Sequence, residues 1–207
     1  MSDINFENKT VVVTGAGNGL GKAYAMEFAK RGANVVVNDI GGSVDGAGSE
    51  NAPADIVVEE IKSNGGSAVA NYDSVATKDG GQSIIDTALN EFGSIHSVVN
   101  NAGILRDKSF AKMEEEDFNA IIDVHLKGTF FVCQPAFIQM KEQGFGRFVN
   151  VSSPSGLFGN FGQLNYGAAK MGIVGLTNVL AIEGMKYNIK ANAIAPNAAT
   201  RMTETLF

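Results

Sequence analysis

Tyr166 and Lys170 stand four residues apart, and they are the first pair in this sequence whose side chains could do chemistry together. Residues with this spacing share one face of a helix, and the residues around them are predicted to be helical. A phenol has a pKa of about 10, and a nearby ammonium group lowers that pKa because it favours the phenolate. The phenol could then act as a general acid or base closer to neutral pH.

Ser153 lies shortly before this helix, directly after a predicted strand. Its hydroxyl could hydrogen-bond an oxygen of a substrate, because parallel sheets bind ligands at the carboxyl ends of their strands. A tyrosine and a lysine four residues apart are common on helices, and this spacing taken alone would indicate structural residues. The serine, together with a nucleotide-binding turn earlier in the chain, favours the catalytic interpretation.

That turn is the segment GAGNGLG (15–21), which follows the apolar run TVVVT and precedes a predicted helix. Glycines between a strand and a helix let the backbone approach a pyrophosphate closely. The N–H groups and the positive dipole end of the helix N-terminus then bind the phosphates. The strand before the turn and the helix after it are what the motif requires, so the sequence predicts a dinucleotide site.

Asp39 ends the second predicted strand, 18 residues after Gly21. A carboxylate at this spacing is expected to bind the adenosine ribose hydroxyls and to repel the 2′-phosphate of NADP. The sequence therefore predicts NAD as the cofactor. Lys22, directly after the glycines, could weaken this preference.

The chain alternates between short β-branched runs and longer segments with helical periodicity. This pattern predicts an α/β fold of three layers, with a doubly wound parallel sheet of the Rossmann type in one domain over 1–207. Gly41–Gly48 is expected to be a surface loop, and Pro135 is expected to kink or break a long helix. The predicted strands are 10–14, 34–39, 67–72, 96–101, 146–152 and 189–195, and the predicted helices are 20–31, 54–63, 82–92, 113–143 and 166–187.

Composition excludes several other classes of protein. The 207 residues carry 16 basic and 22 acidic side chains, a net charge of −6 that disfavours nucleic-acid binding. Cys133 is the single cysteine and is expected to be buried, and two histidines are too few for a predicted metal site. We find no secretory signal and no uninterrupted apolar run of about 18 residues, so we expect a soluble intracellular protein without a membrane segment.

Five motifs together resemble those of the short-chain dehydrogenase/reductase family. They are TGAGNGLG (14–21), NNAG (100–103), VSSPSG (151–156), YGAAK (166–170) and IAPNA (194–198). The resemblance covers essentially the whole chain. It implies a Rossmann-type fold and NAD(P)-dependent oxidation of alcohols or reduction of ketones.

The resemblance also implies roles for single residues. Ser153 would polarise the substrate oxygen, Tyr166 would be the acid/base, and Lys170 would hold the nicotinamide ribose and lower the pKa of the tyrosine. Asn101 would lie along the cofactor, and Asp73 would face the adenine. The implied cofactor-binding set is Gly15, Asn18, Gly19, Leu20, Gly21, Asp39, Asp73, Ser74, Asn101, Ala102, Gly103, Tyr166, Lys170, Pro196, Ala198, Ala199 and Thr200.

Longer segments are similar to the (3R)-hydroxyacyl-CoA dehydrogenases of this family. These segments are 38–42, 100–113, 159–172 and 192–205. The similarity implies NAD-dependent interconversion of (3R)-3-hydroxyacyl-CoA and 3-ketoacyl-CoA in fatty-acid β-oxidation, and a homodimer in the full-length form. It implies a peroxisomal location for a eukaryotic chain and a cytoplasmic one otherwise. The alternatives are a hydroxysteroid dehydrogenase, a 3-oxoacyl carrier-protein reductase, or a catalytically idle nucleotide-binding fragment.

Two features depart from the family pattern. His125 stands where many members have an asparagine that completes a tetrad with a bound water, so the proton-relay role is unassigned. The chain also ends at Phe207, before the substrate-covering helical segment and the seventh strand that the family normally has. We therefore expect a six-stranded sheet that lacks this lid, with the sixth strand at an exposed edge.

Overall fold

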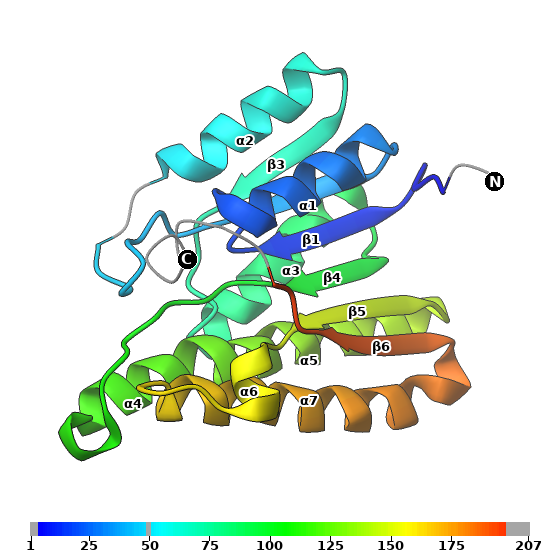
Figure 1. Ribbon diagram of the computed structural model, residues 1–207. Helices are drawn as coiled ribbons and strands as arrows, with labels where there is room; N and C mark the ends of the chain where they lie inside the picture. The colour runs from blue at the N-terminus through cyan, green and yellow to red at the C-terminus, as the bar shows by residue number, and fades with distance from the viewer. Residues whose placement is uncertain (1–3, 49–50, 198–207) are drawn as a thin grey trace.

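The computed structural model of the protein describes residues 4–48 and 51–197. Its centre is one parallel sheet in the order β3-β2-β1-β4-β5-β6 (Figure 1). The strand order starts at β1 in the middle and winds outward in both directions, which confirms the predicted doubly wound fold. In this sheet β6 forms an edge, as expected. The strands are β1 (Thr10–Thr14), β2 (Asn34–Asn38), β3 (Ser67–Asn71), β4 (Ser97–Asn100), β5 (Gly146–Val151) and β6 (Ile189–Ile194).

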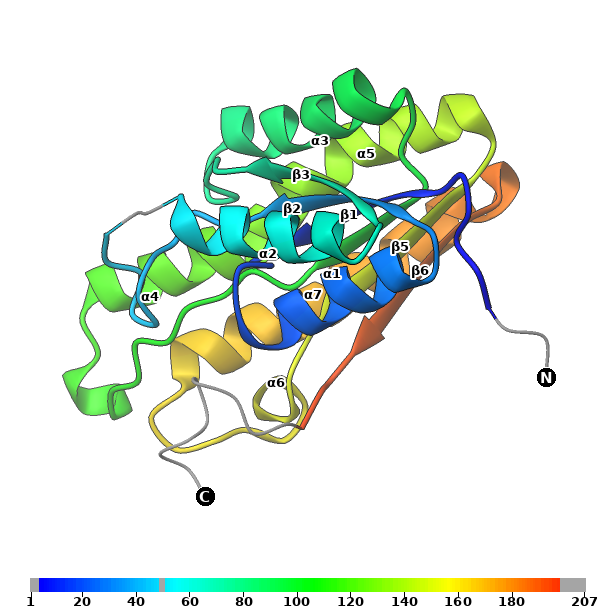
Figure 2. The same cartoon turned by 90° about the horizontal axis from the view of Figure 1, so that it is seen from above.

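Helices cover both faces of the sheet, so the molecule has three layers. Figure 2 shows α1 and α2 on one side of the sheet and α3 and α5 on the other. The long helix α7 packs against β5 and β6. The helices are α1 (Gly19–Lys30), α2 (Ala52–Ser63), α3 (Lys78–Phe92), α4 (Glu115–Ile121), α5 (Gly128–Gln143), α6 (Pro154–Phe158) and α7 (Leu164–Gly184), with short 3₁₀ turns η1 (Phe110–Lys112) and η3 (Met185–Tyr187) and a π-helical segment η2 (Ile122–Lys127).

Consecutive valines explain why the sheet can be covered on both faces. Val11 and Val13 of β1 pack with α1 and α2, whereas Val12 packs with α3 and α5. Successive side chains of a strand point to opposite faces of the sheet, so an unbroken apolar run makes each strand apolar on both. Cys133 is buried among the second set, as predicted, and burial raises the pKa of its thiol to about 12.

Of the two expectations for Pro135, a kink or a break, the break is wrong, because α5 runs through this residue. A proline in a helix leaves the carbonyl four residues earlier without its N–H partner. Here that carbonyl belongs to Phe131 and faces Gly81 of α3, where an added Cβ would lie only 2.5 Å from the oxygen. The interruption of the long helix is instead the π-helical segment η2, which lies before α5.

The helical run Glu115–Gln143 has 29 residues and a mean hydropathy of 1.2 in its most apolar window, enough by length and composition to cross a membrane. In the fold, α5 packs against α3, β4 and β5. The core helix of a globular domain has the same length and composition, so this feature is weak support for a membrane segment.

Candidate active site

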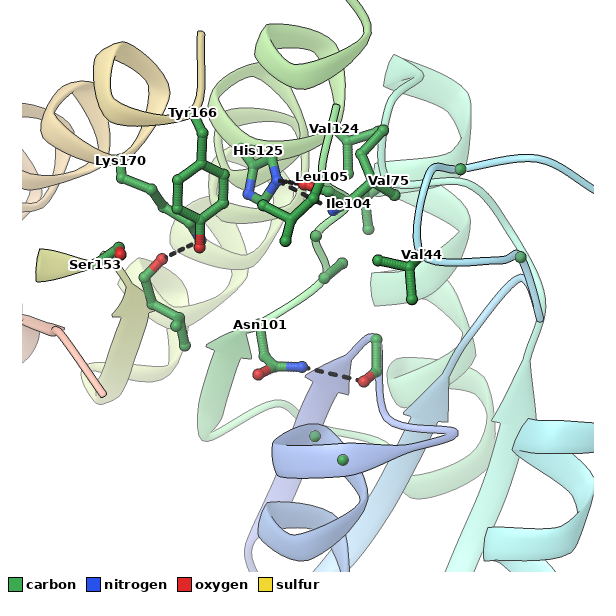
Figure 3. Close-up of a pocket in the computed structure, with 18 of the residues that line it drawn as sticks. Val44, Val75, Asn101, Ile104, Leu105, Val124, His125, Ser153, Tyr166 and Lys170 are labelled. Carbon is green, nitrogen blue, oxygen red and sulfur yellow. Dashed lines mark hydrogen bonds between the residues drawn. The ribbon is translucent and has the colours of Figure 1, made fainter. Parts of the chain in front are cut away.

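The segments that follow all six strands surround one cavity of about 610 Å³ (Figure 3). Fifteen of the predicted site residues lie in the described part of the chain, and all fifteen line this cavity. Ala198, Ala199 and Thr200 lie outside the described residues. Sequence reasoning missed the apolar part of the lining, Val44, Val75, Ile104, Leu105 and Val124, because apolar residues carry no motif.

The glycine turn has the shape that a phosphate site needs. Gly15 and Gly19 adopt positive φ values of 61° and 55°, a conformation that favours glycine. A Cβ on Gly15 would lie 2.7 Å from the Cα of Ala102, whereas a Cβ on Gly19 would meet nothing within 4 Å. Asn18 is the N-cap of α1 and makes no capping bond with its side chain. The free N–H groups of the first turn and the open space at Gly19 therefore fit a pyrophosphate.

Asn101, directly after the neighbouring strand β4, fixes this turn. Its side-chain amide donates to the carbonyl oxygens of Thr14 and Gly15, at 3.0 Å each. The hydroxyl of Thr14 in turn accepts from the backbone N–H groups of Asn101 and Ala102. The sequence indicated that Asn101 lies along the cofactor, and the structure adds that it braces the turn.

Asp39 and Asp73 are both held by hydrogen bonds at the rim of the cavity. The carboxylate of Asp39 accepts from the backbone N–H of Gly17 at 2.8 Å and from that of Gly41 at 2.7 Å. The carboxylate of Asp73 accepts from Asn71 at 2.9 Å and from the Ser83 hydroxyl at 2.7 Å. Both carboxylates are thus fixed in orientation before any ligand binds.

Lys22 does not offset the charge of Asp39. Its ammonium group is 2.6 Å from the carboxylate of Glu60 on α2, in a partly exposed ion pair. The possibility that Lys22 weakens the preference for NAD therefore finds no support in this arrangement.

Ser153, Tyr166 and Lys170 come together at the end of β5 (Figure 3). The spacing of Tyr166 and Lys170 predicts that these two share a helix face, whereas the sequence distance to Ser153 does not predict its contact with them. Ser153 caps α6, where its hydroxyl accepts from the backbone N–H of Ser155 at 3.1 Å, and the same hydroxyl is near enough to the Tyr166 phenol to lower the pKa of that phenol. Lys170 is 3% exposed, donates to the carbonyl oxygen of Val151 at 2.6 Å and lies 5.4 Å from the Tyr166 ring centroid. The predicted juxtaposition of acid/base, lysine and serine is present.

The predicted direction of the tyrosine pKa is wrong for this structure. Burial raises the pKa of Tyr166, and this effect outweighs the Ser153 hydrogen bond that lowers it, while the charge of Asp107 adds to the increase. Burial also lowers the pKa of Lys170 to about 7. Burial disfavours the charged form of a lysine. The same burial that places Lys170 beside the phenol therefore makes its ammonium group easier to deprotonate.

His125 stands where the sequence left the proton-relay role unassigned. In the structure it lines the cavity beside Tyr166. Its Nε2 lies 3.1 Å from the backbone N and 2.8 Å from the carbonyl oxygen of Ile104, and its ring meets that of Tyr166 edge-on at 5.1 Å. An added Cβ on Gly103 would lie 2.4 Å from the imidazole. Burial, and then the charge of Lys170, lower the pKa of His125 well below its usual value. The π-helical segment η2 carries the neutral imidazole at this position.

The cavity thus combines a glycine turn that fits a pyrophosphate with oriented carboxylates and a phenol beside a lysine. The family model for the short chain dehydrogenase matches residues 9–207. The chain belongs to the short-chain dehydrogenase family. With the Rossmann-type fold, this membership makes the protein an oxidoreductase that uses a nicotinamide nucleotide.

Relatives of this short-chain dehydrogenase differ greatly in length. A short-chain type dehydrogenase/reductase of Mycobacterium tuberculosis is 60% identical over 97% of this chain, which covers 70% of that protein. The peroxisomal multifunctional enzyme type 2 of Mus musculus is 56% identical over 99% of this chain, which covers 28% of the enzyme. The crystal structure of a short chain dehydrogenase from Mycobacterium avium matches with a TM-score of 0.87 at 47% identity, covering 98% of this chain and 72% of that one.

Proposed function

We propose that this short-chain dehydrogenase interconverts (3R)-3-hydroxyacyl-CoA and 3-ketoacyl-CoA with NAD, in fatty-acid β-oxidation. The observation that carries the proposal is the convergence of Ser153, Tyr166 and Lys170 on a cavity whose far side holds the carboxylate of Asp39. The substrate class is supported by the resemblance to the (3R)-hydroxyacyl-CoA dehydrogenases and by relatives named as peroxisomal enzymes with a dehydrogenase activity. The peroxisomal hydratase-dehydrogenase-epimerase of Saccharomyces cerevisiae is 56% identical over 99% of this chain, which spans 22% of that enzyme.

In the oxidative direction, Tyr166 takes the proton from the oxygen of the substrate hydroxyl as the hydride leaves the carbon that bears this hydroxyl. The cofactor, when bound, supplies the hydride acceptor and the positive charge of its oxidised ring. Ser153 hydrogen-bonds the substrate oxygen and stabilises the charge that develops on it. Lys170 would bind the nicotinamide ribose, and its ammonium group, where protonated, favours the phenolate of Tyr166.

Tyr166→Phe tests this assignment because it removes only the oxygen that carries the proton. General acid–base catalysis contributes about 10²–10⁴ in rate, so turnover should fall by about that factor while NADH still binds. We would measure NADH absorbance in a steady-state assay with hydroxyacyl-CoA, hydroxysteroid and acyl-carrier-protein substrates, and NADH binding by fluorescence. A variant with near-normal turnover would make Tyr166 a structural residue, and an unmodified protein that binds NADH but oxidises none of these substrates would favour an idle nucleotide-binding module.

Preference for NAD over NADP follows from Asp39. Its carboxylate is fixed by Gly17 and Gly41, with Lys22 engaged elsewhere. Two like charges 4 Å apart repel by roughly 1–4 kcal/mol, depending on the local dielectric. Asp39→Ala should therefore bring the dissociation constants for NAD and NADP closer together. Equal affinity of the unmodified protein for both cofactors would contradict the assignment.

The main alternative within the family is an NADPH-linked reductase. A 3-oxoacyl-[acyl-carrier-protein] reductase of Synechocystis is 41% identical over 96% of this chain, which covers 77% of that protein. Asp39 argues against this alternative, and the same cofactor comparison decides between them.

The peroxisomal relatives support a peroxisomal location, and the bacterial relative supports a cytoplasmic one for a bacterial chain.

A homodimer is supported by an apolar face on α5 and α7. Ile138 on α5 and Met171, Val179 and Ile182 on α7 are 51% to 70% exposed, and Gly175 between them has no neighbour within 4 Å of an added Cβ. A contiguous exposed apolar patch marks a surface for interaction with another chain or a ligand. Sedimentation of the unmodified protein and of Ile182→Glu would test whether this face joins two copies.

A further inference from the structure

The segment between β2 and α2 does not run directly from one to the other but folds back on itself after Asp39. We call residues 41–47 the strap. The backbone N–H of Ser43 donates to the carbonyl oxygen of Ala47 at 2.9 Å, and the Ser43 hydroxyl donates to the same oxygen at 2.9 Å. The carboxylate of Asp45 accepts from the Ser43 hydroxyl and from the backbone N–H of Ala47. The strap is therefore the surface loop that its glycines predicted, and its own hydrogen bonds fold it into a turn.

The strap reaches across the cavity to the segment that follows β4. The backbone N–H of Leu105 donates to the carbonyl oxygen of Val44 at 2.9 Å, and the Arg106 Nε donates to that of Asp45 at 3.0 Å. Gly46 packs against the end of the Ile104 side chain, where an added Cβ would lie 2.9 Å away. These two hydrogen bonds and one apolar contact join two segments that are about 60 residues apart in the chain.

The sheet order decides what lies beneath this connection. Because β1 lies between β2 and β4, a connection between the segments after β2 and β4 passes above the end of β1. The glycine turn 15–21 begins at that end. Val44 projects into the cavity on the side of Val75 and Ile104 (Figure 3).

A dinucleotide that reaches from Asp39 after β2 to Tyr166 beyond β5 must cross the same strand ends. It would therefore lie between the glycine turn and the strap. We propose that the strap is a gate for the nicotinamide dinucleotide, and that Arg106 is the side chain that latches it shut. The proposal depends on the cofactor class of the family, and not on the acyl substrate or on the preference for NAD.

Arg106 is oriented for this role by α4. Its guanidinium lies 3.6 Å from the carboxylate of Glu116 and 3.9 Å from that of Asp117, while its Nε donates to the strap. Lys108 also pairs with Asp117, at 2.7 Å, but no contact with the strap is found for it among the described residues. Lys108→Ala therefore removes a neighbouring cation that shares the Asp117 carboxylate with Arg106, but it leaves the hydrogen bond from Arg106 to the strap in place, and it is the matched control.

Binding rates distinguish a gate from a simple contact. A gate that opens more often admits and releases the ligand faster, so the association and dissociation rates rise together and the dissociation constant changes little. Loss of a contact with the ligand raises the dissociation rate alone. One hydrogen bond is worth about 1 kcal/mol, which corresponds to about fivefold in the fraction of open molecules.

The experiment measures NADH and NADPH binding by stopped-flow fluorescence without substrate. We expect Arg106→Ala to raise both rate constants about fivefold, and Lys108→Ala to leave both unchanged. Unchanged rates in Arg106→Ala, or a rise in the dissociation rate alone, would overturn the gate.

A second pair of variants tests the apolar contact. Gly46 and Gly48 both have positive φ values, 87° and 73°, but only Gly46 faces Ile104. Gly46→Ala should raise both rates more than Gly48→Ala does, because both alanines strain the backbone and only the first displaces Ile104. Equal effects would mean that backbone strain and not the contact controls the rates. Amide hydrogen exchange of the strap should also slow when NADH binds, and exchange that is the same with and without NADH would contradict closure over the ligand.

Discussion

Replacement of His125 by asparagine should remove part of the sensitivity of this protein to acid. His125 is 1% exposed, and burial and the charge of Lys170 keep its pKa well below the usual value. In the unfolded chain the same imidazole binds a proton with a pKa of about 6.5. As the pH falls through 6.5, the unfolded state therefore binds a proton at this imidazole and the folded state does not. Because the unfolded state binds more protons, the free energy of unfolding decreases.

The size of this effect follows from the unfolded pKa, because the folded state keeps the imidazole neutral. Lowering the pH from 7.5 to 5.5 should then cost about 1.4 kcal/mol through His125 alone. In a chain of this size that corresponds to a decrease of roughly 3–5 °C in Tm. The loss of the contacts with Ile104 and Tyr166 lowers the stability of His125→Asn at both pH values, so only the difference between them is informative.

Urea unfolding of both proteins at pH 7.5 and 5.5, at matched ionic strength, measures this difference. Lys170 and other groups that titrate in this range are present in both proteins and largely cancel. His96→Asn is a useful comparison, because burial and Lys9 also lower the pKa of His96, which is less deeply buried. We expect His125→Asn to lose about 1.4 kcal/mol less than the unmodified protein over this interval. If both proteins lose the same amount, His125 is not held neutral in the folded state.

Two further predictions concern stability. Burial lowers the pKa of Lys170 to about 7, so the unfolded state binds more protons between this value and about 10.4, and the free energy of unfolding should rise by about 2 kcal/mol from pH 7 to pH 9. Lys170→Met should lack this rise in chemical unfolding at the two pH values, and a rise that persists in the variant would refute the assignment. Gly81→Ala should destabilise the protein by roughly 1–3 kcal/mol, because the new Cβ meets the Phe131 carbonyl oxygen at 2.5 Å. Gln82→Ala on the exposed side of the same helix is the control, and equal Tm values for the two variants would show that α3 and α5 separate without cost.

The sequence by itself determined the six strands and the main helices, though not the short helix α6 or the π-helical segment η2, and it predicted the type of site. Apolar runs such as TVVVT predict strands that are buried on both faces, because successive side chains alternate across the sheet. The glycine turn and the spacing of Tyr166 and Lys170 act within one turn or one helix. Such local features depend on neighbouring residues alone, so one sequence is enough to recognise them.

Tertiary structure decided the electrostatics and the closure of the site. The raised pKa of Tyr166 and the lowered pKa of Lys170 come from burial beneath segments distant in sequence, which the spacing of the two residues cannot express. The helix continues through Pro135 because Gly81, on another helix, leaves room beside the freed carbonyl. The hydrogen bond between Arg106 and the strap joins the segments that follow β2 and β4. These segments lie within reach of each other because the sheet order places β2 and β4 on the two sides of β1. Burial and long-range contacts are properties of the assembled sheet, so these features could not be predicted from local patterns.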